Sequence, residues 1–273
     1  MGNWQRVYFV VYFVILVSNI SYSQIAICSW NLKDFGGTKS EAELDFIATI
    51  IKDFDVVAIQ EVVAKDPAGA QAVDRLADVL NRKGAKWDYS ISNPTSGISY
   101  KSERYAFLWK TSKLTKVGDA WLEKQYSLEI DREPYFATFE AKGKLFTLVN
   151  FHAITKSMHP ETEIKYFKFL PGEYPQLNLI FCGDFNCPET HTVFNPLKSY
   201  GYKPVLKNQK TTLRQQCIDD DCLASEYDNI FFDLSKARFL NAGVILFYKN
   251  FRTVSDAESI SDHVPIYFEF TLN

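Results

Sequence analysis

The sequence predicts an α/β protein in which helices cover β-sheets. Short, almost continuously apolar segments alternate with segments whose apolar residues recur at the spacing of a helix face. Strands of this kind are typical of sheets that are buried on both faces. Where two strands follow each other without a helix between them, as at 135–140 and 145–150, we expect antiparallel pairs.

The expected strands are apolar runs bounded by polar or turn residues. They span residues 25–30, 55–59, 104–109, 135–140, 145–149, 179–182, 230–232 and 266–270. The last run alternates apolar and polar residues, which indicates a strand with one buried face. A sheet built from these strands needs helices to cover it.

Helices are expected between these strands. A capping-box signature at Ser40 and Glu43 opens the first helix. Its apolar face comprises Leu44, Ile47, Ile50, Ile51 and Phe54. The second helix carries Val73, Leu76, Ala77 and Leu80, and is expected to end near Gly84. A third is expected at 161–170, where Pro171-Gly172 would stop it.

Length and composition predict one folded unit. The chain has 273 residues, of which 47% are hydrophobic and 15% aromatic, so a substantial core can form. No repeat, low-complexity run or flexible linker divides the sequence. The candidate site residues described below are spread from Asn31 to His263. We therefore expect a single domain at 24–273, after an N-terminal leader.

The leader, residues 1–23, has the pattern of a secretory signal peptide. Arg6 precedes an apolar run at 7–17, and Ser21 and Ser23 are small residues where a signal peptidase would cleave. A membrane anchor is the alternative, but the eleven-residue run is shorter than the ~20 residues that span a bilayer. We expect a mature chain that begins at Gln24, is secreted or periplasmic, and has no stable membrane association.

The charge balance limits the possible functions. The formal net charge is −3. Proteins that hold nucleic acid tightly and without sequence preference are usually basic, so the sequence argues against such a binder. It does not argue against a hydrolase that acts on phosphates, because bound cations can supply positive charge at the reacting group.

Five cysteines in an exported chain allow disulfides, with one thiol left over. Cys28 and Cys182 lie in apolar strands, so we expect buried thiols. Cys217 and Cys222 flank a polar turn at 218–221, which makes a local disulfide the first choice. No cysteine lies in a Cys-x-x-Cys pair or beside a histidine. This distribution argues against a zinc site.

Polar residues of catalytic type stand at the ends of the expected strands. Asp184 and Asn186 follow one strand, and Asp262 and His263 precede another. Residues two apart in a strand share a face, and open α/β sheets bind ligands at strand ends. Oxygen side chains suit a hard cation such as Mg²⁺, and imidazole suits proton transfer near neutral pH. The pattern predicts metal-assisted chemistry on a phosphate.

The complete order of these motifs resembles the endonuclease/exonuclease/phosphatase superfamily. The motifs are Trp30-Asn31, Gln60-Glu61, Glu103-Arg104-Tyr105, Arg132-Glu133-Pro134, Asn150-Phe151-His152, Gly183-Asp184-Phe185-Asn186, Tyr227-Asp228-Asn229 and Ser261-Asp262-His263. The third and fourth favour the deoxyribonuclease I-like branch. The resemblance covers nearly all of the chain after the leader. It implies a four-layer sandwich of two packed mixed β-sheets flanked by helices.

The resemblance also implies roles for the motif residues. One or two Mg²⁺ ions, with Mn²⁺ as a substitute, would be held by Asn31, Glu61, Asp184, Asn186 and Asp262. Proton transfer would fall to His152 and His263, oriented by Glu103 and Asp228, with the acid and the base left unassigned. The scissile phosphate would be bound by Arg132, Asn150 and Tyr227. A structural Ca²⁺ and a disulfide from Cys187 to Cys217 or Cys222 are further implications.

The predicted function is a secreted, divalent-metal-dependent phosphodiesterase, and most specifically a monomeric endonuclease that hydrolyses DNA with low sequence specificity. The departures concern duplex recognition. Val62-Val63 follows Glu61 where deoxyribonuclease I has a groove-binding arginine, and Ser102 is an extra residue between Tyr100 and Glu103. The alternatives are a phospholipid or inositol-phosphate phosphodiesterase on the same fold and a non-catalytic binding protein.

Overall fold

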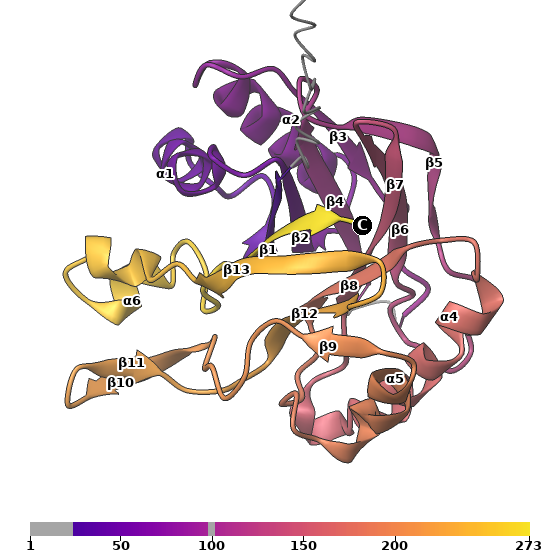
Figure 1. The fold of residues 1–273 in the computed structure, drawn as a ribbon. Helices are drawn as coiled ribbons and strands as arrows, with labels where there is room; N and C mark the ends of the chain where they lie inside the picture. Colours follow the sequence, from indigo (N-terminus) through magenta and orange to yellow (C-terminus); the bar gives the residue numbers. More distant parts are fainter. Residues whose placement is uncertain (1–23, 98–101) are drawn as a thin grey trace, which may run out of the picture.

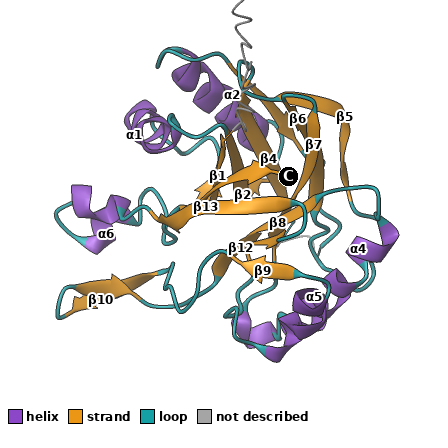
Figure 2. Ribbon diagram, viewed as in Figure 1, coloured by secondary structure: helices purple, strands orange, loops and turns teal. Residues whose placement is uncertain are grey.

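The structure, a computed structural model, describes residues 24–97 and 102–273. The expected leader at 1–23 and Tyr100 lie outside the described residues. Two six-stranded sheets pack against each other, with helices on their outer faces (Figures 1 and 2). This arrangement confirms the predicted four-layer α/β sandwich.

The first sheet, sheet A, has the strand order β13-β14-β1-β2-β4-β3. β1 and β2 are parallel, and the other pairs are antiparallel. The strands are β1 (Gln24–Phe35), β2 (Val56–Val63), β3 (Trp87–Ile91), β4 (Glu103–Lys110), β13 (Ala237–Val244) and β14 (Ile266–Leu272). The last strand of the chain thus lies beside the first, inside the sheet.

The second sheet, sheet B, has the strand order β5-β6-β7-β8-β12-β9. β7 and β8 are parallel, and the other pairs are antiparallel. The strands are β5 (Thr115–Leu122), β6 (Tyr135–Ala141), β7 (Lys144–His152), β8 (Leu179–Asp184), β9 (Tyr202–Pro204) and β12 (Asp228–Asp233). The antiparallel pairing of β6 with β7 is the one expected from the sequence.

A separate hairpin, β10 (Leu213–Ile218) and β11 (Asp221–Leu223), projects from the body of the molecule (Figure 1). The disulfide between Cys217 and Cys222 closes it, as the local spacing predicted. Cys28, Cys182 and Cys187 are buried free thiols. The alternative pairing through Cys187 is therefore not formed.

Helices cover the outer face of each sheet. Sheet A is covered by α1 (Glu41–Ile51), α2 (Ala68–Asn81), η4 (Phe247–Asn250) and α6 (Val254–Ala257). Sheet B is covered by α3 (Glu161–Ile164), η2 (Lys165–Lys168), α4 (Leu170–Glu173), η3 (Thr192–Phe194) and α5 (Asn195–Ser199), and η1 (Lys156–Met158) precedes α3. No helix among the described residues is long and apolar enough to cross a membrane.

The helix boundaries agree with the sequence in one case and differ in another. The capping box of α1 is present, since Ser40 and Glu43 exchange hydrogen bonds. The single helix expected at 161–170 is instead broken into α3, η2 and α4. Pro171 does not stop it but lies in the first turn of α4, where its missing N–H has no helical partner to lose.

The main core lies between the two sheets. Its largest fully buried side chains include Phe107 from sheet A and Phe139 and Phe146 from sheet B. Alternation along β14 fits this packing, because Ile266, Phe268 and Phe270 are buried and the residues between them are half-exposed. The apolar contact fixes the sheets relative to each other, and with them the strand ends that carry the polar motifs.

Candidate active site

Strand ends from both sheets line a cleft of about 740 Å³. Sheet A contributes Glu61 and Glu103, and sheet B contributes His152 and Asp184. The other predicted site residues that line the cleft are Arg132, Asn186, Tyr227, Asp262 and His263. Residues that are far apart in the sequence therefore meet at one place, as their positions at strand ends predicted.

Asp184, at the end of β8, is the centre of this cluster. Its Oδ2 atom lies 3.4 Å from Nε2 of His152 and 3.6 Å from Nε2 of His263. The amide of Asn31, from the other sheet, donates to the same oxygen at 3.1 Å. Burial would raise the pKa of this carboxyl, but the charges of His263 and His152 hold the pKa below its ordinary value. Asp184 is therefore anionic at neutral pH.

Gly183 allows β8 to bring Asp184 to this position. Its φ is +138°, and a Cβ atom there would lie 1.9 Å from the carbonyl oxygen of Phe151 on β7. Only glycine avoids that contact and adopts this backbone conformation without strain. The Gly-Asp pair in the motif is thus explained by the close approach of β7 and β8.

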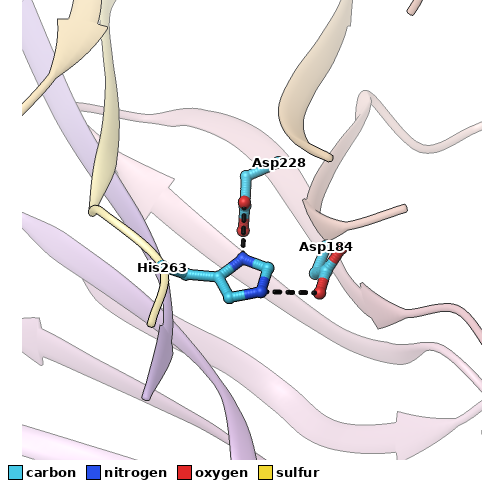
Figure 3. A group of neighbouring side chains, drawn as sticks. All are labelled: Asp184, Asp228 and His263. Atoms are coloured by element: carbon cyan, nitrogen blue, oxygen red, sulfur yellow. Dashed lines mark hydrogen bonds and ion pairs between the residues drawn. The ribbon is translucent and has the colours of Figure 1, made fainter. Parts of the chain in front are cut away.

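The first histidine–carboxylate pair is His263 with Asp228 (Figure 3). Nδ1 of His263 lies 2.7 Å from Oδ2 of Asp228, and Nε2 points to Asp184. Burial lowers the pKa of His263, but the charges of Asp228 and Asp184 outweigh it, and the pKa is raised well above its ordinary value. The ring thus has one nitrogen fixed by a carboxylate and the other free to face the cleft.

Two hydroxyl groups hold this pair in place. Thr211 Oγ1 accepts hydrogen bonds from the amides of Tyr227 at 3.2 Å and Asp228 at 3.0 Å. Ser261 Oγ accepts from the amide of His263 at 3.0 Å and donates to the carbonyl of Asn31 at 2.5 Å. The loop that carries His263 is thereby tied to β1.

The second pair is His152 with Glu103. Both carboxylate oxygens of Glu103 lie 3.0 Å from Nδ1 of His152, and Oε2 also accepts from Nη1 of Arg132 at 3.1 Å. Burial would raise the pKa of Glu103, but the charges of His152 and Arg132 lower it below its ordinary value. Arg132 also donates to the carbonyl oxygen of Ala153. The carboxylate that pairs with Arg132 is therefore Glu103.

Glu61 reaches the cleft from an irregular part of β2. The pairing of β2 with β4 shifts register between Ile59 and Val62, and Glu61 has a φ of +59°. A left-handed residue in a strand is strained, and such bulges often re-aim a side chain at a functional site. Here the carboxylate accepts from the Asn31 amide at 3.1 Å and from the Asp34 backbone amide at 3.2 Å.

The residues around Asn31 fit a hard divalent cation. Its Oδ1 atom is buried and has no hydrogen-bond partner, and its Nδ2 atom donates to carboxylates of both Glu61 and Asp184. Two carboxylates held by one amide, together with the unpaired amide oxygen of the same side chain, are oxygen groups of the kind that Mg²⁺ prefers. Asn186 and Asp262 add further oxygen side chains to the cleft.

A different group, Asp184, Asp228 and His263, also offers ligand atoms within 4.8 Å of one another. In this group Nδ1 of His263 is already engaged with Asp228 at 2.7 Å. The geometry therefore favours a proton-transfer pair at Asp228 and His263, with oxygen ligands on the side of Asn31.

Asn150 is not among the residues that line the cleft, and its predicted contact with the phosphate stays a prediction. Its side chain is 0% exposed. It accepts from Nε2 of Gln60 at 2.5 Å and donates to the carbonyl of Ile59 at 3.0 Å. Residues 150 and 152 share a face of β7, and only the outer one, His152, emerges from between the sheets. Asn150 instead links sheet B to sheet A.

Sequence reasoning missed the residues that support the site. Gln60 and Ser261 belong to the motifs, but the roles were assigned to Glu61, Asp262 and His263 beside them. The hydrogen bonds of Gln60 with Asn150 and of Ser261 with Asn31 and His263 were therefore not predicted. Thr211 lies in no motif, and its hydroxyl acts on backbone amides that a sequence pattern does not reveal. Lys65, four residues after Glu61, also lines the cleft.

Residues 28–263 match the profile of the Endonuclease/Exonuclease/phosphatase family. The chain therefore belongs to this family, as the order of its motifs indicated. The deoxyribonuclease names of its curated relatives support the predicted resemblance to the deoxyribonuclease I-like branch.

A deoxyribonuclease of Thioalkalivibrio sp. (strain K90mix) is 26% identical and aligns with 97% of this chain and 76% of its own length. Human deoxyribonuclease gamma is also 26% identical, over 94% of this chain and 89% of its own length. An endonuclease/exonuclease/phosphatase structure from Bacteroides vulgatus has a TM-score of 0.66 at 15% identity, covering 92% of this chain and 100% of that chain. The relatives support a hydrolase of phosphodiester bonds.

Proposed function

We propose that this protein is a secreted, divalent-metal-dependent endonuclease that hydrolyses DNA with little sequence preference. One observation carries the proposal. Two histidine–carboxylate pairs approach Asp184 from different strands, each with Nε2 facing the same cleft. Each Nδ1 lies beside a carboxylate that orients the ring, and each Nε2 points to Asp184 at the centre of the cleft, where the reacting groups would bind.

The two imidazoles suit an in-line displacement at phosphorus. One histidine takes a proton from water as the water oxygen forms its bond to phosphorus. The other gives a proton to the leaving oxygen as the old phosphorus–oxygen bond breaks. The pKa of His263 is raised well above its ordinary value. The pKa of His152 is also raised, because the charge of Glu103 outweighs burial. A raised pKa supports a protonated imidazole as the donor to the leaving oxygen.

The oxygen side chains beside the histidines would hold Mg²⁺, or Mn²⁺ in its place. The residues are Asn31, Glu61, Asp184, Asn186 and Asp262. A bound divalent cation stabilises charge on a phosphoryl oxygen and lowers the pKa of a bound water. Glu61, with its carboxylate held by Asn31 and Asp34, would be the ligand whose charge matters most.

Several features of the cleft support DNA as the substrate. Arg132 brings a guanidinium to the wall of the cleft, and Tyr227 and Lys65 line it as well. Contacts of this kind act on phosphates and carry no base information, so we expect low sequence preference. The deoxyribonuclease names of the curated relatives support the same substrate.

The leader pattern at 1–23 supports export, with Gln24 as the first mature residue. The disulfide between Cys217 and Cys222 fits an oxidising compartment. Amino-terminal sequencing of the exported protein tests this part of the proposal. A full-length product that begins at Met1 in the membrane fraction would favour an anchor.

Digestion of supercoiled plasmid by the purified mature chain tests the activity. We expect cleavage with Mg²⁺ and none with a chelator. Glu61→Gln keeps the shape of the side chain and removes its charge, so cleavage should fall by roughly 10²-fold or more and recover partly with excess metal. Glu140→Gln, an exposed change on β6, is the control. Hydrolysis of sphingomyelin without any cleavage of plasmid, single-stranded DNA or RNA would overturn the nuclease proposal.

A further inference from the structure

Glu163 is a buried carboxylate that has no role in the site described so far. It lies on α3 and is 2% exposed. One oxygen accepts from the amide of Asp131 at 2.6 Å, and the other accepts from the amide of Ile154 at 2.9 Å. The two amides belong to different loops. One loop leads into Arg132, and the other follows His152.

We propose that Glu163 is a positioning residue that holds Arg132 and His152 in their places on the wall of the cleft. The inference rests on the proposed function, because Glu163 would act only through these two groups. It is not placed to touch the substrate in the way that the cleft-lining histidines are.

The contacts around Glu163 form a closed ring. Asp131 is joined to Arg132 along the chain, and Ile154 is joined to Ala153. Arg132 donates to the carbonyl oxygen of Ala153, and Glu163 closes the ring by binding both flanking amides. A shift of either loop would break a bond of this ring, so the two loops are fixed relative to each other.

The ring is connected to the cluster at the centre of the cleft. The carbonyl of Ala153 also accepts from Nδ2 of Asn186 at 3.1 Å. Arg132 binds Glu103 at 3.1 Å, and Glu103 in turn holds His152. The positions of Arg132, Asn186 and His152 therefore depend, through these hydrogen bonds, on the position of the Glu163 carboxylate.

A carboxylate is required for this arrangement. Both of its oxygens accept an amide proton, whereas glutamine has one oxygen and an NH₂ group that would face an N–H. The charge also acts on Arg132. Burial lowers the pKa of that guanidinium, but the charge of Glu103 and the smaller contribution of Glu163 raise the pKa above its ordinary value.

Glu123 provides a matched control. It is 1% exposed and accepts from two backbone amides, Gln125 at 2.9 Å and Tyr126 at 3.0 Å. Its contacts lie at the other end of the loop that leads to Arg132. Glu163→Gln and Glu123→Gln therefore remove the same kind of bonds, and both should lower the midpoint of thermal unfolding.

Activity should separate the two variants. A misplacement of about 1 Å can cost roughly 10²-fold in rate. We expect Glu163→Gln to lower kcat/KM by about 10- to 100-fold on plasmid and on bis(4-nitrophenyl) phosphate, and Glu123→Gln to lower it by less than about threefold. Equal losses in the two variants would overturn the proposal.

A double-mutant cycle and a spectroscopic measurement complete the test. In an Arg132→Ala background, Glu163→Gln should cost less than it does in the wild type, because one of the two groups it positions is gone and only His152 remains. An unchanged loss in that background would contradict positioning of Arg132. The NMR signal of the Arg132 guanidinium should shift in Glu163→Gln and not in Glu123→Gln.

The NMR comparison does not depend on activity. A wild-type protein that cleaves neither substrate would overturn the proposed function, and the Arg132 signal would still decide the inference. An Arg132 signal that is the same in wild type and in Glu163→Gln would overturn the positioning role, whatever the activity of the wild type.

Discussion

In both histidine–carboxylate pairs Nδ1 of the ring lies beside a carboxylate, but the two carboxylates have different further partners. Glu103 is shared between His152 and Arg132, with contacts of 3.0 and 3.1 Å. Asp228 makes one 2.7 Å contact with His263, and within the described residues no arginine or lysine forms a salt bridge with it. The pKa of both imidazoles is raised by the paired carboxylate against the effect of burial, and that of His263 is raised well above its ordinary value.

This difference shows that a carboxylate beside a histidine can act on the imidazole alone or on a second cation as well. The charge of Glu103 is divided between an imidazole and a guanidinium, so its removal would disturb proton transfer and phosphate binding together. The charge of Asp228 acts on one imidazole, that of His263, and it forms no salt bridge with an arginine or lysine among the described residues. The same kind of mutation should therefore have different kinetic signatures in the two pairs.

The largest effects are expected from removal of the imidazoles. His152→Ala and His263→Ala should each lower kcat/KM by roughly 10²–10⁴-fold, because each loses a positioned acid or base. The losses in the double variant should combine less than additively if both act in one transition state. His159→Ala, an exposed change, is the control. If either variant kept a near-normal rate, that histidine would be structural.

Removal of the carboxylate charges should distinguish the pairs directly. Asp228→Asn is expected to lower kcat by roughly 10²-fold with little change in KM, since only His263 loses its partner. Glu103→Gln should lower kcat and also raise KM, because Arg132 is released. Steady-state kinetics on a labelled oligonucleotide measure both values. A matching change of KM in the two variants would show that Arg132 does not depend on Glu103.

The hydroxyl of Thr211 supports only the pair of His263. Thr211→Val keeps the shape and leaves two amides without an acceptor, so the free energy of unfolding should fall by about 1–3 kcal/mol. Thr138→Val, which breaks the 2.9 Å contact of Thr138 with Thr147 inside sheet B, is the control. Denaturant unfolding should detect both losses, but only Thr211→Val should slow cleavage. If Thr211→Val and Thr138→Val cleaved DNA at the same rate, Thr211 would have no specific effect on the active site.

The smallest effect is expected in the hairpin that begins next to Thr211. A hydrogen bond from Lys210 and one from the amide of Leu223 lower the pKa of Asp221 to about 2, from an ordinary value of 3.8. A lowered pKa means that the carboxylate stabilises the hairpin above pH 3.8, and that this contribution is lost as the pH falls towards 2. Amide exchange of Leu223 should therefore quicken over that range, and Asp221→Asn should abolish the change.

The fold and most of the candidate site could be predicted because both depend on strand ends. Asp184 and His263 stand next to apolar runs whose direction and pleat determine where their side chains emerge. The order of the motifs then predicts which strand ends meet. The resemblance implied Glu103 as the partner of His152, but the sharing of Glu103 with Arg132 is seen only in the structure.

Asn150 and Thr211 show where such reasoning stops. Asn150 stands near the end of its strand, but the end lies between two sheets, and only the packing reveals that Gln60 faces it. Thr211 acts through backbone amides, which have no sequence signature. The helix expected at 161–170 is a third case, because the structure divides this segment into α3, η2 and α4.

The place of β14 in sheet A also determines what the second imidazole needs in order to reach the cleft. β14 pairs with β1 and with β13. Asp262 and His263 immediately precede it. If β14 is not paired, Glu61, Asp184 and His152 are still held by other strands, but His263 is not held beside them. Docking of β14 between β1 and β13 is therefore the step that completes the cleft.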